Sequence, residues 1–365
     1  MTPDASEEGS GSKTPAETVI EEILDEIRVP KPILDEAKDR RNQVLEIADD
    51  HPAGRAPFRS GSVAHGTGNK PLEDADGGEM INRRYEEFRV YGPDGSGEGP
   101  TRFVESFRAL IEREVRRTYP NATATTVGQK RSIKIEFHAP VDFDEWGEVD
   151  PYVDFIVGLG IADDSTGIWI PNLETDSWDP GDPQYHTYLM TKKDPRELSI
   201  YRAKILRLAK RAVKRDAANG GVAVVCSWNL SALALEYFEE VTTLSEGLER
   251  FLAYASDQIA LILTPDPSDV ITDPIKLPKG VTQQQASARL AEMAAVVRGA
   301  NSQLSVAGAR TELSGIFGDE IKAVSAREGR NLRNALQSGD AAAVGAAVDS
   351  SFTQKKTSSY ATGGS

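Results

Sequence analysis

The sequence predicts an α+β protein in which a small sheet-bearing lobe is followed by a lobe of helices, with a ligand cleft between the two. Two observations support this fold class. Clear strand spacing is confined to residues 123–173, whereas helical spacing dominates from residue 196 onward. The length of 365 residues and the hydrophobic content of 39% suit one large domain, or two lobes that share a core.

The first elements are predicted to be helices. Residues 16–29 carry apolar side chains at helical spacing, and Pro30 and Pro32 end that helix. A second helix is expected over 33–50, ahead of a stretch rich in glycine, serine and threonine. Residues 78–91 fit either a strand or a helix, and 92–100 have the composition of a loop. An amphipathic helix over 101–119 is expected to end at Pro120.

The next elements are predicted to be strands. Apolar and polar residues alternate from Ile133 to Phe137, which indicates a strand within 123–139. Further strands are expected over 151–161 and 167–173, and helices over 196–216, 228–240, 244–263 and 282–299. The predicted organisation is a disordered segment over 1–14, a sheet lobe with its N-terminal helices over 15–195, a helical lobe over 196–350, and a flexible tail over 351–365.

Composition excludes several classes of protein. The formal net charge of −15 argues against holding nucleic acid by bulk electrostatics, so we expect no constitutive DNA binding. A single cysteine, Cys226, excludes an internal disulfide and a cysteine-built zinc site. No apolar run approaches the roughly 20 residues that span a bilayer, and the acidic N-terminus does not fit a signal peptide. We therefore expect a cytoplasmic protein without a membrane segment.

The segment GSVAHGTGNKPLEDADGG, residues 61–78, carries the main candidate site. Asp74 and Asp76 are two positions apart, so on an extended segment both carboxylates point to one face and can reach a common cation. Mg²⁺ prefers such hard oxygen ligands and usually shares them with substrate phosphates. Asp154 is the candidate for a third carboxylate, because it is the one charge inside an apolar strand, where it is costly without a partner.

A phosphate cradle is expected directly before this aspartate pair. Gly61 permits a close approach of the backbone, and Ser62 and Thr67 can donate their hydroxyls. Backbone N–H groups in this turn, and at a helix start that follows it, would add further donors. Taken singly, each of these features is common in loops; Asp154 could equally be a strand-end carboxylate satisfied by backbone N–H groups.

The predicted helix 196–216 has a basic face and an apolar face. Lys210 borders the two and is the better candidate for a phosphate ligand, with Arg207 second, although a solvated basic face is the alternative. Other residues have two open interpretations. Three aromatic side chains fit either base stacking or core packing: Trp178, Tyr185 and Tyr188. Three polar side chains fit either contact with an acceptor nucleotide or surface exposure: Gln129, Lys130 and Arg131.

These motifs together resemble those of the polymerase-β-like nucleotidyltransferases. The run Gly61-Ser62-x-x-x-Gly66-Thr67, the Asp74-x-Asp76 pair and the later Asp154 within a hydrophobic strand are similar to the pattern of the bacterial cGAS/DncV-like nucleotidyltransferases, or CD-NTases. The likeness continues in YRAKILRLAKRAVKR and VVCSWNLSALALEYF and covers roughly residues 20–300. It implies a nucleotidyltransferase lobe with a mixed sheet, and Ser227 as a contact of the triphosphate.

The resemblance also implies an activity. Asp74 and Asp76 would hold the metal that grips the donor triphosphate, and Asp154 would complete a second site, with two Mg²⁺ ions or alternatively Mn²⁺. By this resemblance the protein would join NTPs, ATP among them, into a cyclic oligonucleotide second messenger of antiphage signalling (CBASS), with accessory proteins. A linear oligonucleotide synthetase or another nucleotidyltransferase stays open. So does a catalytically quiet nucleotide-binding regulator, which Gly77-Gly78 after the second aspartate would favour. The chain lacks a Cys/His cluster for zinc-dependent DNA sensing.

Overall fold

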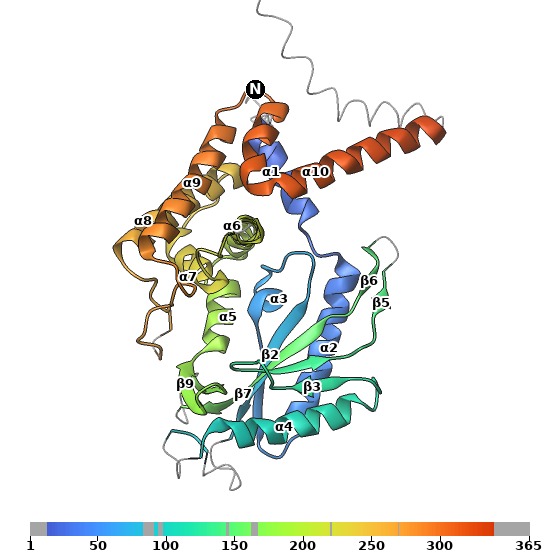
Figure 1. Ribbon diagram of the computed structural model, residues 1–365, viewed down its shortest axis with the longest axis vertical. Coiled ribbons are helices and arrows are strands. Elements are labelled where there is room, and N and C mark those ends of the chain that lie inside the picture. The colour runs from blue at the N-terminus through green and yellow to red at the C-terminus, as the bar shows by residue number, and fades with distance from the viewer. Residues whose placement is uncertain are drawn as a thin grey trace, which may run out of the picture.

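A sheet lobe and a helical lobe lie end to end in the computed structural model, with α5 and α6 leading from one to the other (Figure 1). The structure describes residues 13–82, 91–93, 98–143, 146–161, 167–219, 221–268 and 270–338. The predictions for the two chain ends fall almost wholly outside these residues, as does most of the undecided segment 78–91. The division of the chain at residues 195 and 196 stays a prediction.

The main sheet is mixed. Its strand order is β1-β2-β7-β4-β3, with β8 paired to β7 and β9 to β8. Only the pairing of β2 with β7 is parallel among these described strands. The bounds are Gly54–Ser60 for β1, Asp74–Ile81 for β2, Thr123–Thr125 for β3, Ile133–Glu136 for β4, Tyr152–Gly160 for β7, Ile168–Asn172 for β8 and Ser177–Gly181 for β9. A separate two-stranded sheet pairs β5 (Val141–Asp142) with β6 (Glu148–Val149).

Two helices cover one face of the main sheet. Helix α2 (Lys31–Asp49) packs on β1, β2 and β7, and α4 (Pro100–Val115) packs beside it on β3, β4 and β8. Alternation along β2 sends Gly77 toward Leu45 of α2 and Gly78 toward Phe58 on the opposite face. By the same alternation, Asp74 and Asp76 lie on the face of the sheet that α2 does not cover. The end of β2 that carries these two aspartates is turned toward the helical lobe.

The helical lobe has its own core. It contains α6 (Arg196–Ala218), α7 (Ser227–Tyr237), α8 (Leu244–Leu261), α9 (Gln283–Asn301) and α10 (Val306–Ser338). The sequence places α1 (Pro15–Glu26) with the sheet lobe, whereas its buried side chains, such as Ile20 and Ile23, lie in this helical core. Helix α1 thus packs against the last described helix, α10 (Figure 1).

The α+β prediction is confirmed, and seven elements are additions to it. The elements not predicted are strand β1, the short α3 (Gly61–His65), the paired strands β5 and β6, strand β9, α5 (Pro183–Thr191) and α10. Four glycines lower the helix propensity of the α10 sequence, and its backbone is non-helical at Phe317, where two helices meet at a kink. Packing against α1 and α9 compensates for this weak propensity. None of the described helices has the length and apolar character needed to cross a membrane.

Candidate active site

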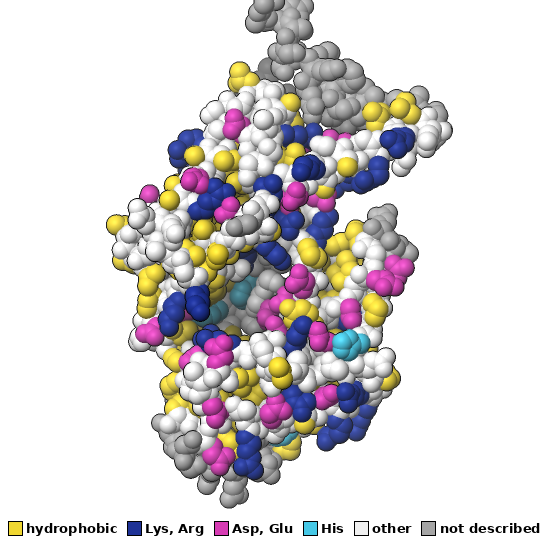
Figure 2. All heavy atoms as spheres, viewed as in Figure 1, with side chains coloured by type: hydrophobic (Ala, Val, Ile, Leu, Met, Phe, Trp, Pro, Cys, Tyr) yellow, Lys and Arg dark blue, Asp and Glu magenta, His cyan; other side chains and the backbone are white. Residues whose placement is uncertain are grey.

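A cavity of about 610 Å³ lies between the two lobes. Its walls come from α3 and the loop that follows it, from the start of β2, and from the facing sides of α6 and α7. In Figure 2 the molecule is hollowed between the lobes, and acidic, basic and histidine side chains all gather around the hollow. Most residues of the predicted site line this cavity: Gly61, Ser62, Thr67, Asp74, Asp76, Lys210 and Ser227.

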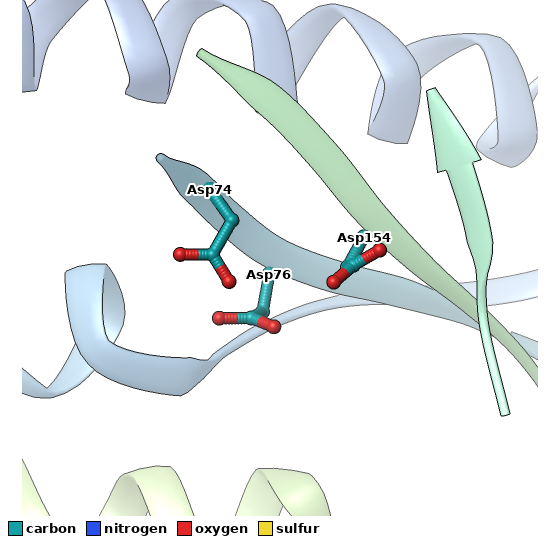
Figure 3. Close-up of side chains that lie close together, drawn as sticks. All are labelled: Asp74, Asp76 and Asp154. Atoms are coloured by element: carbon teal, nitrogen blue, oxygen red, sulfur yellow. The ribbon is translucent and has the colours of Figure 1, made fainter. Parts of the chain in front are cut away.

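The three predicted aspartates come together because of strand pairing (Figure 3). Asp74 and Asp76 lie on one face of β2, two positions apart. Asp154 lies on β7, which runs parallel to β2 with Asp154 directly beside Asp76. One carboxylate oxygen from each aspartate lies within 4.8 Å of the others. These partly buried hard oxygen ligands fit a divalent cation such as Mg²⁺, and Asp74 and Asp76 line the cavity whereas Asp154 does not.

The turn between β1 and α3 closes over these carboxylates. Gly61 has a φ of 69°, and a Cβ atom there would lie 1.7 Å from Oδ2 of Asp76. Glycine is therefore required both by the backbone conformation and by the close approach. The backbone N–H of Ser62 donates a hydrogen bond to Asp76, which couples the turn to the candidate metal site.

Electrostatics at the site favours a bound cation. Burial, together with the charges of Asp74 and Asp154, raises the pKa of Asp76 to about 7. Burial is also the main cause that raises the pKa of Asp74 and of Asp154. The three carboxylates are partly buried and repel one another, so a bound cation would stabilise their ionised forms.

Lys210 is a basic residue that the structure brings to Thr67, in the turn predicted to hold phosphate. Its ammonium donates to Oγ1 of Thr67 at 3.0 Å, across the cavity between the lobes. Burial lowers the pKa of Lys210 to about 8. Thr67 is 2% exposed, so the hydroxyl that receives this hydrogen bond is itself held in place. Ser227 is the first residue of α7, and its exposed side chain lines the cavity on the side formed by the helical lobe.

Arg207 lies elsewhere. It does not line the cavity; its Nε donates to Oδ1 of Asn69 at 3.1 Å, and the Asn69 side chain donates in return to the Arg207 carbonyl at 2.8 Å. A further hydrogen bond runs from Arg207 to the carbonyl of Leu24 at 3.3 Å. The residue therefore holds the loop after Thr67 against α6 and α1.

The residues with two open interpretations also lie outside this cavity. Trp178 packs edge-on against Phe103, and Tyr185 stacks on Tyr188. Lys130 pairs with Glu174, Arg131 pairs with Asp179, and Gln129 lines a separate surface pocket near α4.

Several residues of the site were not predicted. His65 and Trp228 line the cavity, the latter directly after Ser227 in the sequence. Ser132 donates to Oδ1 of Asp154 at 3.3 Å, and the charge of Lys134 acts on the same carboxylate. Of these, Trp228 could have been found from its place beside Ser227. The contact of Ser132 depends on the antiparallel register of β4 with β7, for which the sequence carries no signal.

No protein-family model and no curated protein sequence matches the chain. Solved structures do match its fold. The CD-NTase CdnG of Bradyrhizobium diazoefficiens, solved with GTP, is 17% identical, with a TM-score of 0.66 and coverage of 86% of this chain and 98% of that one. CdnC of E. coli MS115-1, solved with a HORMA protein, is 16% identical, with a TM-score of 0.55 and coverage of 84% and 97%.

A third match is the Vibrio cholerae cyclic AMP-GMP synthase DncV, solved with a nonhydrolysable GTP. It is 13% identical, with a TM-score of 0.53 and coverage of 84% of this chain and 87% of that one. The chain therefore has the fold of the CD-NTases, the cGAS/DncV-like branch of the nucleotidyltransferases, as its motifs predicted. Asp74 and Asp76 line its interlobe cavity, and Asp154 lies beside them in a cluster of three aspartates.

Proposed function

We propose that this protein is a metal-dependent nucleotidyltransferase that joins NTPs, ATP among them, into a cyclic oligonucleotide second messenger. The observation that carries the proposal is the register of β2 and β7, which gathers Asp74, Asp76 and Asp154 beside a glycine-serine turn. The CD-NTase fold, shared with proteins solved with GTP and ATP, supports the same reaction class.

The residues have distinct roles in this proposal. Asp74 and Asp76 would hold the cation that binds the donor triphosphate, and Asp154 would complete a second cation site on the acceptor side. Two Mg²⁺ ions, or Mn²⁺, would neutralise phosphate charge and lower the pKa of the acceptor hydroxyl. The acceptor hydroxyl oxygen would bond to the donor α-phosphorus as its proton passes to solvent. The bond from that phosphorus to the α–β bridging oxygen would break, and pyrophosphate would leave.

The turn and the helical lobe hold the triphosphate. Gly61 and Ser62 offer backbone and hydroxyl donors next to the aspartates, and Thr67 and Ser227 offer further hydroxyls. Lys210 has the position for a phosphate ligand, because its ammonium reaches the turn from α6. An arriving triphosphate would favour the charged form of Lys210 and so offset the effect of its burial. The contacts of Arg207 favour a role in holding the loop after Thr67 rather than a phosphate contact.

One observation weighs against a catalytically quiet regulator. Gly77 and Gly78 do not interrupt β2, which pairs with β7 from Asp74 to Ile81. A Cβ atom at Gly78 would lie 2.3 Å from the carbonyl oxygen of Ile156 and 2.4 Å from the Phe58 ring, so packing requires the glycine. The strand that carries the aspartates is therefore continuous.

The cellular setting that we propose is cytoplasmic antiphage signalling of the CBASS type, with accessory proteins. The complex of CdnC with a HORMA protein is a precedent for such a partner. Activation by long DNA is not part of the proposal, because the chain carries a net charge of −15 and has one cysteine.

The test is product analysis by mass spectrometry after incubation with all four NTPs and Mg²⁺ or Mn²⁺. We expect a phosphatase-resistant oligonucleotide from the wild type and none from the double variant Asp74→Asn, Asp76→Asn. The control Asp176→Asn, in the β8–β9 turn, should retain synthesis. A phosphatase-sensitive product would indicate a linear synthetase. Nucleotide-dependent thermal stabilisation without turnover would indicate a regulator, and synthesis by the double variant would exclude the proposed site.

A further inference from the structure

One aromatic residue on the cavity wall is held by a network behind the wall. Trp228 is the second residue of α7 and lines the cavity next to Ser227. Its ring lies against the imidazole of His186, from α5, with ring centroids 4.2 Å apart and an interplanar angle of 36°. One face of the indole is thus supported by protein, while the residue still contributes surface to the cavity.

A single carboxylate fixes both rings. The indole N–H of Trp228 donates to Oδ2 of Asp266 at 2.9 Å, and Nε2 of His186 lies 3.0 Å from Oδ1 of the same side chain. Since an ionised carboxylate only accepts, Nε2 of His186 carries a hydrogen and donates it. Each oxygen of Asp266 therefore holds one ring, and neither ring can rotate without losing its hydrogen bond.

Asp266 itself is buried and anchored. Its side chain is 4% exposed, and its Oδ1 also accepts the backbone N–H of Ser268 at 2.8 Å. Burial alone would raise its pKa, but the hydrogen bonds from His186 and Trp228 outweigh burial and lower the pKa to about 2. The carboxylate is therefore ionised at neutral pH and accepts at both oxygens.

Asp266 lies in the loop that follows α8, and this loop is also attached to the first turn of α7. The Asn229 side chain donates to Oγ1 of Thr264 and to the carbonyl of Ile275, each at 3.3 Å. Neither Asp266 nor His186 lines the cavity. The loop after α8 therefore acts on the cavity through the α7 residues that it holds, and not by contact with a ligand.

We propose that Asp266 is a positioning residue that, with His186, fixes the Trp228 indole as a platform for the base of a bound nucleotide. This inference rests on the proposed function for the identity of the ligand. An aromatic face that is already oriented stacks on a base without first losing side-chain freedom. Stacking of this kind accepts every base, so the platform supplies affinity, while base choice comes from other contacts.

The test compares two ligands that differ in the base. Calorimetry would measure the affinities of non-hydrolysable ATP and of inorganic tripolyphosphate, both with Mg²⁺, for the wild type and Asp266→Asn. An asparagine cannot accept both ring hydrogens, because its amide nitrogen is a donor. We expect the affinity for the ATP analogue to fall about tenfold, within the range for one base–aromatic stack, and that for tripolyphosphate to stay within about twofold.

A double-mutant cycle with Trp228→Ala assigns the effect to the indole. If Asp266 acts through Trp228, Asp266→Asn should cause no further loss of ATP-analogue affinity in the Trp228→Ala background. Asp176→Asn is the matched control, since Oδ1 of Asp176 also accepts two hydrogen bonds but lies in the sheet lobe. If Asp266→Asn does not fold, His186→Ala takes its place in the cycle, because it removes the support of the indole face.

Three results would overturn the inference. They are unchanged nucleotide affinity in Asp266→Asn, equal losses for the ATP analogue and tripolyphosphate, and additive losses in the cycle. None of these would affect the proposed function, which depends on product formation and on the aspartates. Failure of the wild type to bind any NTP would overturn both.

Discussion

Gly61 and Asp76 are matched to each other at the level of single atoms. The carboxylate of Asp76 occupies the space that a side chain at position 61 would fill, and the Ser62 N–H donates to the same carboxylate. The glycine-serine turn and the candidate metal site are therefore one structural unit. A change at either residue is expected to affect both.

Alanine substitutions at Gly61 and Gly66 distinguish the effect of a clash with Asp76 from the effect of backbone strain. Gly61 and Gly66 have φ angles of 69° and 68°, so alanine at either position costs about 1 kcal/mol of stability. No atom lies within 4 Å of a Cβ at Gly66, whereas at Gly61 that atom would overlap Asp76. We expect Gly61→Ala to abolish NTP turnover and Gly66→Ala to retain it, as measured by product formation and thermal unfolding. Equal activity of the two variants would contradict this role of Gly61.

The pKa of Asp76 gives a prediction about pH. Its folded-state pKa of about 7 exceeds the ordinary value of 3.8, so the folded apo-protein binds this proton more tightly than the unfolded chain. The resulting stabilisation is present at pH 3.8 and below and is lost as the pH rises through about 7. Without metal, Asp76→Asn should therefore raise the free energy of unfolding at pH 8 by about 1–3 kcal/mol.

Thermal unfolding in a chelator at pH 5 and pH 8 would check this prediction. The gain of Asp76→Asn over the wild type should shrink at pH 5, where the folded wild type already carries the proton. Addition of Mg²⁺ should stabilise the wild type more than the variant, because only the wild type keeps the full ligand set. A variant that is less stable than the wild type at pH 8 without metal would contradict the proposed repulsion.

At the scale of elements, the parallel pairing of β2 with β7 decides the geometry of the site. A shift of one residue in this register would move Asp154 to the sheet face covered by α2. The position of Asp154 on a separate strand also allows its role to be separated from that of the pair on β2.

We expect Asp154→Ala to abolish synthesis but to leave binding of the donor NTP largely intact. Asp74 and Asp76 remain on β2 to hold the cation of the triphosphate, while the second cation site loses its ligand. Calorimetry with a non-hydrolysable NTP would measure this, with the Asp74→Asn, Asp76→Asn double variant for comparison. If both variants lose donor binding to the same extent, the division of roles between the two strands is wrong.

At the scale of the whole molecule, α1 connects the loop of residues 67–73, beside the candidate site, to α10. Glu26, near the end of α1, accepts from Lys70 of the loop at 2.8 Å and from Arg327 of α10 at 3.0 Å. Its side chain is 15% exposed, so solvent screens these pairs only partly. Arg310 adds a second link, from α10 to Glu22 of α1 and to Glu328 across the kink.

Glu26→Gln should loosen both ends of this connection. Loss of the charge weakens two partly buried ion pairs, and we expect a loss of about 1 kcal/mol of stability. Hydrogen exchange should become faster in the loop of residues 67–73 and in α10 after Phe317. Glu21→Gln is the control on the same helix, since Glu21 pairs with the exposed Lys13. Unchanged exchange in both segments of Glu26→Gln would show that the link carries no measurable energy.

The sequence by itself determined the fold class and the identity of the three aspartates. Strong periodicity marked α2, α4, α6 and α8, and a lone carboxylate in an apolar strand marked Asp154, because each of these signals is local. The predicted cradle residues also followed from a local signal, the glycine and hydroxyl side chains ahead of the aspartate pair, and they line the cavity. These predictions needed no knowledge of which segments meet in space.

The tertiary structure alone decided how the site is completed. Lys210 rather than Arg207 reaches Thr67, because Arg207 is hydrogen-bonded to Asn69, 138 residues away in the sequence. Helix α10 forms despite its glycines because α1 and α9 cover it, and Trp228 is oriented by Asp266, 38 residues away. Local propensity contains none of this information, since hydrogen bonds and packing between distant segments exist only once the chain has folded.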